Sequence, residues 1–319
     1  MPLLEVKNLK KYYPVKKSLF SQKRYVRAVD DVSFCIEEGE TVGLVGESGC
    51  GKTTLGKLII KLELPTSGQV CLNNRDINTL SGKSLRASRK EYQMIFQDPY
   101  SSLNPRINIL KLLDEVLYLH SSLNRCERYE RIKELVSMVG LKEEHLLRFP
   151  HQFSGGQRQR IGIARAIAVN PKLIVADEPV SALDVSVQAQ IINLLEEIQE
   201  KTNISFLFIA HDLAVVEHIS DKILVMYLGK IVEYGTGDQI CKNSKHPYTR
   251  ALLSAVPSVD SIGKKKTKIL LGDVPSPLNP PDGCRFHPRC SYAQEKCKKI
   301  EPLLAETEDA GHFSACFLN

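Results

Sequence analysis

The chain has 319 residues, of which 43% are hydrophobic and 25% are charged. This length leaves room for one large domain or two smaller ones, and the composition is that of an ordinary globular protein. The 43 basic and 37 acidic residues leave a net charge of only +6. Such a small, dispersed excess does not indicate nucleic-acid binding, although it suits an anionic ligand or a membrane-adjacent surface. We therefore expect no nucleic-acid partner.

The apolar stretches are too short to cross a bilayer. None approaches the roughly 20 residues that a membrane-spanning helix needs, and Ile204–Ala210 is expected to be a core strand instead. The first residues, Met1–Lys7, lack the apolar core of an export signal. Nine cysteines without such a signal favour free thiols or metal ligands over disulfides, so we expect a cytosolic chain.

The N-terminal part predicts strands. Leu3–Leu9 and Val26–Ile36 alternate between apolar and polar residues, as half-buried strands do. The segment between them, Lys10–Arg27, is rich in Lys, Arg and Tyr and is expected to be a basic loop. A run of apolar residues at 41–45 predicts a buried strand, and an amphipathic helix is expected over Leu55–Leu62.

Between that strand and that helix lies a glycine-rich motif. Residues 46–53, Gly-Glu-Ser-Gly-Cys-Gly-Lys-Thr, match G-x-x-x-x-G-K-[ST]. The glycines let the backbone curl so that N–H groups face phosphate oxygens, and the following helix adds the positive end of its dipole. Lys52 supplies a charge for the β- and γ-phosphates, and the Thr53 hydroxyl can coordinate Mg²⁺. Because a strand and a helix flank it, the motif predicts a nucleotide-binding P-loop rather than an ordinary turn.

The middle of the chain changes from helical to alternating structure. Helices are expected over Ile107–Leu119 and Glu127–Val139, in an insert at about residues 100–150. Beyond it, helices and strands alternate, which predicts a mainly parallel sheet covered on both faces. The expected helices are 154–170, 184–201 and 212–219, and the expected strands are 172–177, 204–210 and two short strands within 222–234.

Two adjacent carboxylates end a buried segment. Asp177 and Glu178 follow four apolar residues, Leu173–Ala176. In a P-loop protein, the first acid at this strand end can hold Mg²⁺, and the second can polarise the water that attacks the γ-phosphate. An acidic strand end without a role is the alternative, but the pair of acids after a buried strand favours catalysis.

Other polar residues have local explanations when they are taken singly. Ser154 is a natural helix N-cap, and Gly155 and Gly156 would expose N–H donors in the first turn. His211 and Gln97 each follow an apolar strand, where a structural role is common. Only the order of these features along the chain gives them functional weight.

Together these segments resemble the ATPase subunits of ABC transporters, over about residues 3–240. The resemblance implies an α/β fold of the ABC ATPase type, a P-loop NTPase with a mainly parallel core sheet. It also implies an N-terminal antiparallel β subdomain and a helical subdomain at about 100–170. The matching elements, in the family's order, are the P-loop, Gln97, Phe153–Gln157, Asp177-Glu178, Ser181–Asp184 and His211.

The resemblance further implies ATP hydrolysis with Mg²⁺ and the formation of a dimer. Phe153–Gln157 corresponds to the signature that contacts ATP held by the other subunit, with Phe153 where Leu is commoner, and Ser181–Asp184 corresponds to the D-loop. Tyr13 stands where the family stacks an aromatic ring on adenine, with Tyr12 as the alternative. The implied catalytic residues are Glu178, His211 and Gln97, and the implied Mg²⁺ contacts are Thr53, Gln97 and Asp177.

The resemblance also implies which residues contact the nucleotide. The implied ATP-binding residues are Tyr13, Gly46, Glu47, Ser48, Gly49, Cys50, Gly51, Lys52, Thr53 and Thr54. The implied contacts across the dimer are Ser154, Gly155, Gly156 and Gln157 of the signature and Ser181, Ala182, Leu183 and Asp184 of the D-loop.

Four stretches resemble the peptide-importer branch of that family. They are Phe96–Pro105, His246–Thr249, Gly283–Cys290 and the basic segment Val15–Arg24, the last being similar to the second, "F"-type ATPase of such systems. The implied cargo is di- or oligopeptides, with nickel or another small solute as the alternative because these systems share the branch. A non-transport ABC ATPase is a further alternative, but such proteins generally carry two cassettes or a long coiled coil.

The same resemblance implies a set of partners. A second, similar ATPase would complete a homo- or heterodimer, and two transmembrane permease subunits would hold it at the cytoplasmic face of the membrane as a peripheral protein. An extracytoplasmic peptide-binding protein would act on it only indirectly.

The composition changes again after Pro257. We expect an ABC ATPase domain over 1–260 and a C-terminal extension over 261–319, which contains four of the nine cysteines. Four thiols in a segment without its own core favour a metal staple, although their spacing matches neither the usual zinc ribbon nor a ferredoxin. The resemblance implies a 4Fe-4S cluster, with Zn²⁺ or free thiols as alternatives. The candidate ligands are Cys284, Cys290, Cys297 and Cys316.

Overall fold

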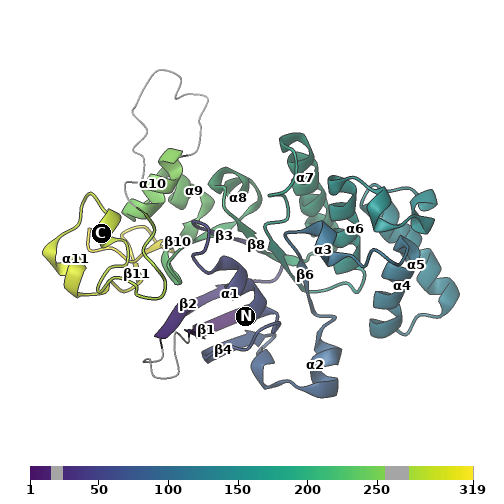
Figure 1. Cartoon of the computed structure of the whole chain (residues 1–319), viewed down its shortest axis with the longest axis horizontal. Coiled ribbons are helices and arrows are strands. Elements are labelled where there is room, and N and C mark those ends of the chain that lie inside the picture. Colours follow the sequence, from purple (N-terminus) through teal and green to yellow (C-terminus); the bar gives the residue numbers. More distant parts are fainter. Residues whose placement is uncertain (16–23, 256–272, 319) are drawn as a thin grey trace. The chain divides into compact units, whose positions relative to one another are not determined.

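The computed structural model describes residues 1–15, 24–255 and 273–318 (Figure 1). They form two compact units, which are described one at a time. The first unit contains residues 1–3, 36–40 and 79–208, and the second contains residues 4–35, 41–78 and 209–319. Most of the basic segment Val15–Arg24 and the expected boundary at residue 260 lie outside the described residues.

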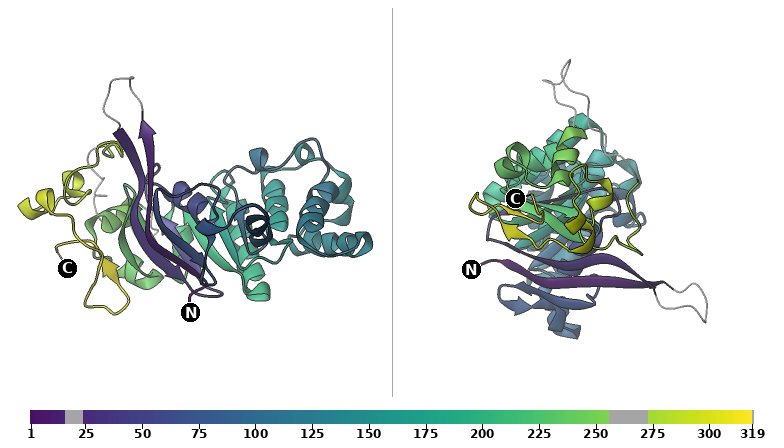
Figure 2. Two further views of the ribbon diagram at one scale, coloured as in Figure 1. Left: turned by 90° about the horizontal axis from the view of Figure 1, so that it is seen from below. Right: turned by 90° about the vertical axis from the view of Figure 1, so that its left-hand side faces the viewer.

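An antiparallel sheet forms the N-terminal part of the second unit. Its strands lie in the order β2-β1-β4-β5, and Figure 2 shows β1 and β2 as a long two-stranded ribbon. Leu4 and Val6 of β1 are buried and lie opposite Leu72 and Val70 of β4, as their alternating pattern predicts. The bounds are β1 Leu4–Val15, β2 Arg24–Ile36, β4 Ser67–Leu72 and β5 Arg75–Asp76.

The expectation of a basic loop over Lys10–Arg27 is wrong at both ends. β1 continues to Val15 and β2 already begins at Arg24. Lys10 still pairs with Ser67, and the backbone N–H of Tyr12 donates to the Thr66 hydroxyl at 2.9 Å. Most side chains of Lys10–Val15 are charged or aromatic and none is fully buried, so this part of β1 has no apolar alternation to reveal it.

A second sheet in this unit carries the segment that leads into the P-loop. β3 (Thr41–Val45) is buried along its whole length and pairs in parallel with β9 (Lys222–Tyr227). β9 pairs antiparallel with β10 (Lys230–Thr236), and two short strands of the C-terminal segment extend this side of the sheet. Those strands are β12 (Phe313–Ser314) and β11 (Ala305–Glu306), of which β12 pairs with β10.

Within the described part of the second unit, the longest helices are α1 (Lys52–Ile59) and α10 (Pro247–Ala255). Asp212 caps the start of α8 by accepting from the N–H of Ala214 at 2.9 Å. The remaining helices are α8 Leu213–Ile219, α9 Gly237–Lys242, α11 Glu295–Lys299 and the 3-10 turns η1 Ile77–Thr79 and η5 His287–Arg289.

The first unit combines buried strands with a helical region. β6 (Tyr92–Ile95) and β7 (Leu173–Asp177) are parallel, and β8 (Ser205–Ala210) lies on the other side of β7. Helix α6 packs against α3, α4, α5 and α7, so it is the central helix of this region (Figure 1). The helices are α2 Gly82–Ser88, α3 Pro99–Ser102, α4 Ile109–His120, α5 Arg125–Met138, α6 Gly155–Ile167 and α7 Val185–Thr202, with 3-10 turns η2 Glu143–Leu147 and η3 Pro150–Gln152.

Most of the expected elements are present within a few residues. The start of α3 is an exception, because Asp98 accepts from the N–H of Tyr100 at 2.8 Å and caps a helical turn in a segment expected to be a loop. α1 begins at Lys52, directly after the P-loop glycines, and ends at Ile59, whereas the amphipathic pattern predicts a helix over Leu55–Leu62. Among the described residues, no helix is both long and apolar enough to cross a membrane.

Candidate functional site

The P-loop follows β3 in the second unit, as its sequence predicts. Gly51 has φ +111°, and a Cβ at this position would lie 2.0 Å from the carbonyl oxygen of Ala28. Only glycine fits here, because the backbone conformation and the close approach both exclude a side chain. Ser48 and Gly49 are exposed at the tip of the loop, whereas Cys50 is buried.

Lys52 lies inside the loop rather than in solvent. Its side chain is 4% exposed, and Nζ donates to the carbonyl oxygens of Gly46 at 2.7 Å and Glu47 at 3.2 Å. An ammonium group held by backbone carbonyls is placed to exchange them for phosphate oxygens. Thr53 and Thr54 follow it in the first turn of α1 and are partly buried.

The outer side of the P-loop contacts the C-terminal part of the chain. The backbone N–H of Glu47 donates to the Tyr248 hydroxyl at 2.8 Å. Both Nη atoms of Arg289 bind the Glu47 carboxylate, at 2.7 Å and 2.9 Å, in a bidentate ion pair. The Glu47 carboxylate raises the pKa of the Arg289 guanidinium. Sequence analysis missed these contacts, although it selected both segments as marks of the peptide-importer branch.

The expected adenine contact and His211 lie in the same unit. The Tyr13 hydroxyl donates to Glu63, and burial together with this bond raises the pKa of Tyr13 to about 12. The alternative, Tyr12, is held differently, since its hydroxyl donates to the buried Asp30. His211 is exposed directly after β8. These contacts involve no nucleotide, so the roles of Tyr13 beside adenine and of His211 at the γ-phosphate stay predictions.

The first unit brings three of the predicted residues together. Asp177 ends β7 and is 3% exposed, and Glu178 follows it with a left-handed φ of +45°. Residues other than glycine adopt this conformation uncommonly, and among them Asn and Asp do so more often than Glu. Gln97 donates from Nε2 to Oε2 of Glu178 at 2.7 Å. The predicted base and the predicted glutamine are thus in direct contact.

The signature residues form a capped helix start, as their sequence predicts. The N–H of Gln157 donates to the Ser154 hydroxyl at 3.3 Å, and the N–H of Ser154 donates to the Gln157 side chain at 3.1 Å. This reciprocal pair is a capping box at the start of α6. A Cβ on Gly156 would lie 2.5 Å from Val187 of α7, so the helices approach too closely there for a side chain.

The D-loop residues pack beside this helix start. A Cβ on Gly155 would lie 3.4 Å from the side chain of Leu183. Upstream, the N–H and hydroxyl of Ser181 both donate to the carbonyl oxygen of Glu178, at 3.3 Å and 3.1 Å. The D-loop therefore connects Glu178 with the N-terminus of α6 inside the first unit. Ala182 and Asp184 are exposed between and after these contacts.

The four C-terminal cysteines line one small cavity of about 20 Å³ in the second unit. That volume is near the minimum for a single water molecule. Burial raises the pKa of Cys284 to about 11 and also raises the pKa values of Cys290 and Cys316. Within the part of the chain that the structure describes, no group of three or more His, Cys, Asp or Glu residues is arranged to hold a metal ion. The expected metal staple therefore lacks support from the geometry of the thiols.

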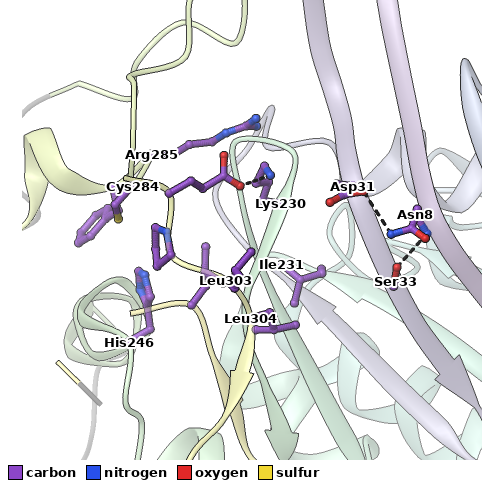
Figure 3. Close-up of a pocket in the computed structure, with 15 residues that line it drawn as sticks. Asn8, Asp31, Ser33, Lys230, Ile231, His246, Cys284, Arg285, Leu303 and Leu304 are labelled. Atoms are coloured by element: carbon purple, nitrogen blue, oxygen red, sulfur yellow. Dashed lines mark hydrogen bonds and ion pairs between the residues drawn. The ribbon is translucent and has the colours of Figure 1, made fainter. Parts of the chain in front are cut away.

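A larger cavity of about 250 Å³ is also lined by the C-terminal segment and shares Cys284 with the small one (Figure 3). Its wall combines the β10 residues Lys230 and Ile231 with the apolar side chains of Leu303 and Leu304. Lys230 is already paired with Glu301, and of the predicted site residues only Cys284 contributes to this wall. We assign no ligand to this cavity.

Comparison with known proteins places the chain in a family. The family model described as "ABC transporter" matches residues 29–181, and the model described as "Oligopeptide/dipeptide transporter, C-terminal region" matches residues 232–297. The oligopeptide transport ATP-binding protein AppF of Bacillus subtilis is 52% identical over 99% of this chain and 97% of its own length. The dipeptide transport ATP-binding protein DppF of Escherichia coli is 48% identical over 99% of this chain and 94% of its own length.

Solved structures agree with this assignment. The ATP-binding cassette MJ0796, in a dimeric post-hydrolysis state with ADP and Pi, is 30% identical, has a TM-score of 0.65, and covers 73% of this chain and 98% of its own. The P-loop NTPase fold inferred from the sequence is thereby confirmed. With half of its residues identical to those of two transport ATP-binding proteins along nearly its whole length, the chain belongs to the ABC transporter family, as an ATP-hydrolysing subunit.

Proposed function

We propose that this subunit powers the import of dipeptides or oligopeptides across the cytoplasmic membrane. The observation that carries the proposal is the match of residues 232–297 to the C-terminal region of oligopeptide and dipeptide transporters. The cassette itself does not identify the cargo, because transporters of many solutes share it. The relatives named for oligopeptide and dipeptide transport support the same cargo over the whole length of the chain.

Each predicted site residue receives a role in this proposal. The P-loop, residues 46–54, binds the phosphates of ATP, with Lys52 neutralising charge and Tyr13 beside adenine. Thr53, Gln97 and Asp177 are the residues that would hold Mg²⁺, and the ion would neutralise charge on the phosphates when bound. Glu178 accepts the proton of the attacking water, while the 2.7 Å hydrogen bond from Gln97 orients its carboxylate. His211 contacts the γ-phosphate.

The signature and the D-loop act on ATP held by a second subunit. The capped start of α6 presents backbone N–H groups near the N-terminus of a 13-residue helix, a suitable environment for a phosphate. ATP bound between two subunits favours their closed arrangement, and hydrolysis removes the group that joins them. The structures of a related cassette as a dimer support this arrangement.

The partners follow from the same proposal. A second, similar ATPase completes the dimer, and two transmembrane permease subunits bind the pair at the cytoplasmic face of the membrane. An extracytoplasmic peptide-binding protein delivers cargo to the permeases, and no nucleic acid takes part. We also retain the division into an ATPase domain over 1–260, with a helical subdomain at about 100–170, and a C-terminal extension over 261–319.

The proposed transport function does not depend on whether the four C-terminal cysteines bind a metal. A 4Fe-4S cluster or Zn²⁺ at these residues would require the 20 Å³ cavity to open and the thiols to lose their protons. Metal analysis of anaerobically purified protein distinguishes a 4Fe-4S cluster, bound Zn²⁺ and free thiols. Protein free of iron and zinc agrees with the thiol arrangement, whereas four irons per chain would show that the segment rearranges around a cluster.

Uptake by cells tests the proposed function directly. Cells whose only copy of this subunit carries Lys52→Ala should lose uptake of a labelled dipeptide and a labelled pentapeptide, while the protein level stays unchanged. Nickel uptake should remain as in the parent cells. Loss of nickel uptake with normal peptide uptake would replace the proposed cargo by the alternative, and normal uptake of both would reject a role in import of either.

A further inference from the structure

A short turn of the C-terminal segment carries two buried arginines toward the P-loop side of the second unit. The turn is Cys284–Cys290, and the arginines are Arg285 and Arg289, whose side chains are each 5% exposed. Hydrogen bonds within the turn fix its path, from the N–H of His287 to the Cys284 carbonyl at 2.9 Å and from the N–H of Arg289 to the Phe286 carbonyl at 3.0 Å. Both guanidinium groups therefore extend from a defined backbone.

Arg289 contacts the P-loop itself. Its bidentate pair with Glu47 fixes two oxygens of one carboxylate at once, which a lysine could not do. Glu47 is the second residue of the P-loop motif and is separated from Arg289 by 242 residues. Since the Glu47 side chain is 22% exposed, the pair is only partly screened by solvent.

Tyr248 holds the backbone at the same residue. Its hydroxyl accepts the N–H of Glu47 at 2.8 Å, and the whole side chain is buried. The Tyr248 ring contacts the rings of Tyr227 and Phe286, with centroids 4.6 Å and 5.4 Å away. Phe286 lies between the two arginines in sequence, so the same turn supports both contacts to Glu47.

Arg285 reaches the P-loop by a second route. It donates to the carbonyl oxygen of Leu228 and to Asp30, and Asp30 receives a further hydrogen bond from Tyr12. Although burial alone would raise the pKa of Asp30, the bond from Tyr12 and the charge of Arg285 lower it, so the carboxylate stays ionised. The adjacent N–H of Gly229 donates to the carbonyl oxygen of Cys50 at 2.8 Å. The P-loop is thus held at Glu47 and at Cys50.

We propose that the C-terminal segment sets the conformation of the P-loop, with Arg289 and Tyr248 as positioning residues for nucleotide binding. These contacts are made on Glu47, while the loop's lysine stays among the carbonyls of Gly46 and Glu47. A loop fixed in advance loses less conformational entropy when phosphate binds, and nucleotide affinity rises accordingly. This inference rests on the proposed role of the P-loop.

The test measures the dissociation constant of ADP·Mg²⁺ for the full chain by isothermal titration calorimetry, because ADP is not turned over. Arg289→Gln should weaken binding about tenfold, equivalent to about 1.4 kcal/mol. Arg289→Lys, which keeps the charge and loses the bidentate geometry, should weaken it about threefold to fivefold. Tyr248→Phe, which removes only the hydroxyl, should weaken it about twofold to threefold.

A double-mutant cycle on Glu47 and Arg289 distinguishes the effect of their mutual contact on nucleotide affinity from the effect of each charge alone. If the pair acts as a unit, Glu47→Gln combined with Arg289→Gln should weaken binding less than the product of the two single effects. Lys298→Gln, which breaks an exposed pair with Glu295 in the same segment, is the matched control and should leave binding unchanged. Thermal unfolding without nucleotide shows that each variant is folded.

Several results would overturn the inference. Wild-type affinity in Arg289→Lys and Tyr248→Phe would show that only net charge matters, and multiplicative effects in the cycle would show that the two residues act independently. A lowered unfolding temperature with unchanged affinity would make the contacts purely structural. If instead the wild-type chain binds no ADP·Mg²⁺, or Lys52→Ala binds as well as wild type, the proposed role of the P-loop fails first.

Discussion

A fully buried carboxylate in the second unit gives the sharpest stability prediction. Glu233 of β10 is 0% exposed and accepts hydrogen bonds from the N–H groups of Lys245 at 2.5 Å and His246 at 3.1 Å. Its carboxyl group is also hydrogen-bonded to Nε2 of His312 at 2.8 Å. It thereby joins β10, the segment before α10 and the end of the C-terminal segment. We predict that Glu233→Gln destabilises the chain.

The size of the effect follows from the hydrogen bonds. The N–H groups of Lys245 and His246 bind different oxygens of Glu233, so whichever oxygen becomes an NH₂ group, one buried backbone donor loses its acceptor. That loss costs about 1–3 kcal/mol, and the remaining bonds lose the benefit of a charged acceptor, so the expected total is about 3 kcal/mol. The entropy of unfolding is about 2.1 cal/mol/K per residue, so in a chain of 319 residues such a change should lower the thermal midpoint by roughly 4–5 °C.

Thermal unfolding followed by circular dichroism measures the effect, with Glu301→Gln as the control. Glu301 pairs with Lys230 near the same sheet but is 45% exposed, so its loss should change the free energy of unfolding by no more than about 0.5 kcal/mol. If Glu233→Gln proves as stable as the control, the buried carboxylate is not the anchor that its contacts indicate.

Three further predictions concern the site and the thiols. Gly51→Ala should distort the P-loop and abolish ADP·Mg²⁺ binding in calorimetry, because its Cβ would lie 2.0 Å from the Ala28 carbonyl; tight binding would contradict the strain argument. Gln97→Ala should lower kcat for ATP hydrolysis about 10- to 100-fold with little change in KM, since Glu178 loses an orienting hydrogen bond; an unchanged kcat would remove Gln97 from the mechanism. Because burial raises the pKa of Cys284 to about 11, its alkylation by iodoacetamide at pH 8 should be roughly a hundredfold slower in the folded chain than in guanidinium. Mass spectrometry measures both rates, and equal rates would show that the folded thiol is ionised as readily as the unfolded one.

Local sequence signals predicted the parts of the site that depend on neighbouring residues. The P-loop could be predicted because its glycines, its lysine and its flanking strand and helix lie within one short segment. Asp177 and Glu178 could be predicted because a buried strand ends directly before them. The N-cap of Ser154 follows from the same kind of local rule.

Contacts between distant segments gave no comparable signal. Nothing near Glu47 indicates that Arg289, 242 residues away, binds its carboxylate. Glu233 and His312 are polar residues in a strand and a C-terminal segment, and their burial arises only when the two segments pair. The C-terminal segment was expected to be a separate extension, because hydrophobic periodicity identifies a single helix or strand and does not show what that element packs against.

The cysteine spacing shows a related limit. Four thiols in a short segment are compatible with a metal, with disulfides or with simple packing, and the spacing fixes neither their orientation nor the room between them. In the structure they line a cavity of about 20 Å³, and Cys284 has a raised pKa. The small cavity and the raised pKa give no support to a bound metal, which the number of cysteines alone could not have shown.

Parallel measurements of nucleotide binding and ATP hydrolysis on wild type, Lys52→Ala and Glu178→Gln test the central claim most directly. Wild type should bind and hydrolyse ATP, Lys52→Ala should lose binding, and Glu178→Gln should bind normally while its turnover falls by about 10²- to 10⁴-fold. Undiminished hydrolysis by Glu178→Gln, or normal ATP binding by Lys52→Ala, would contradict the account.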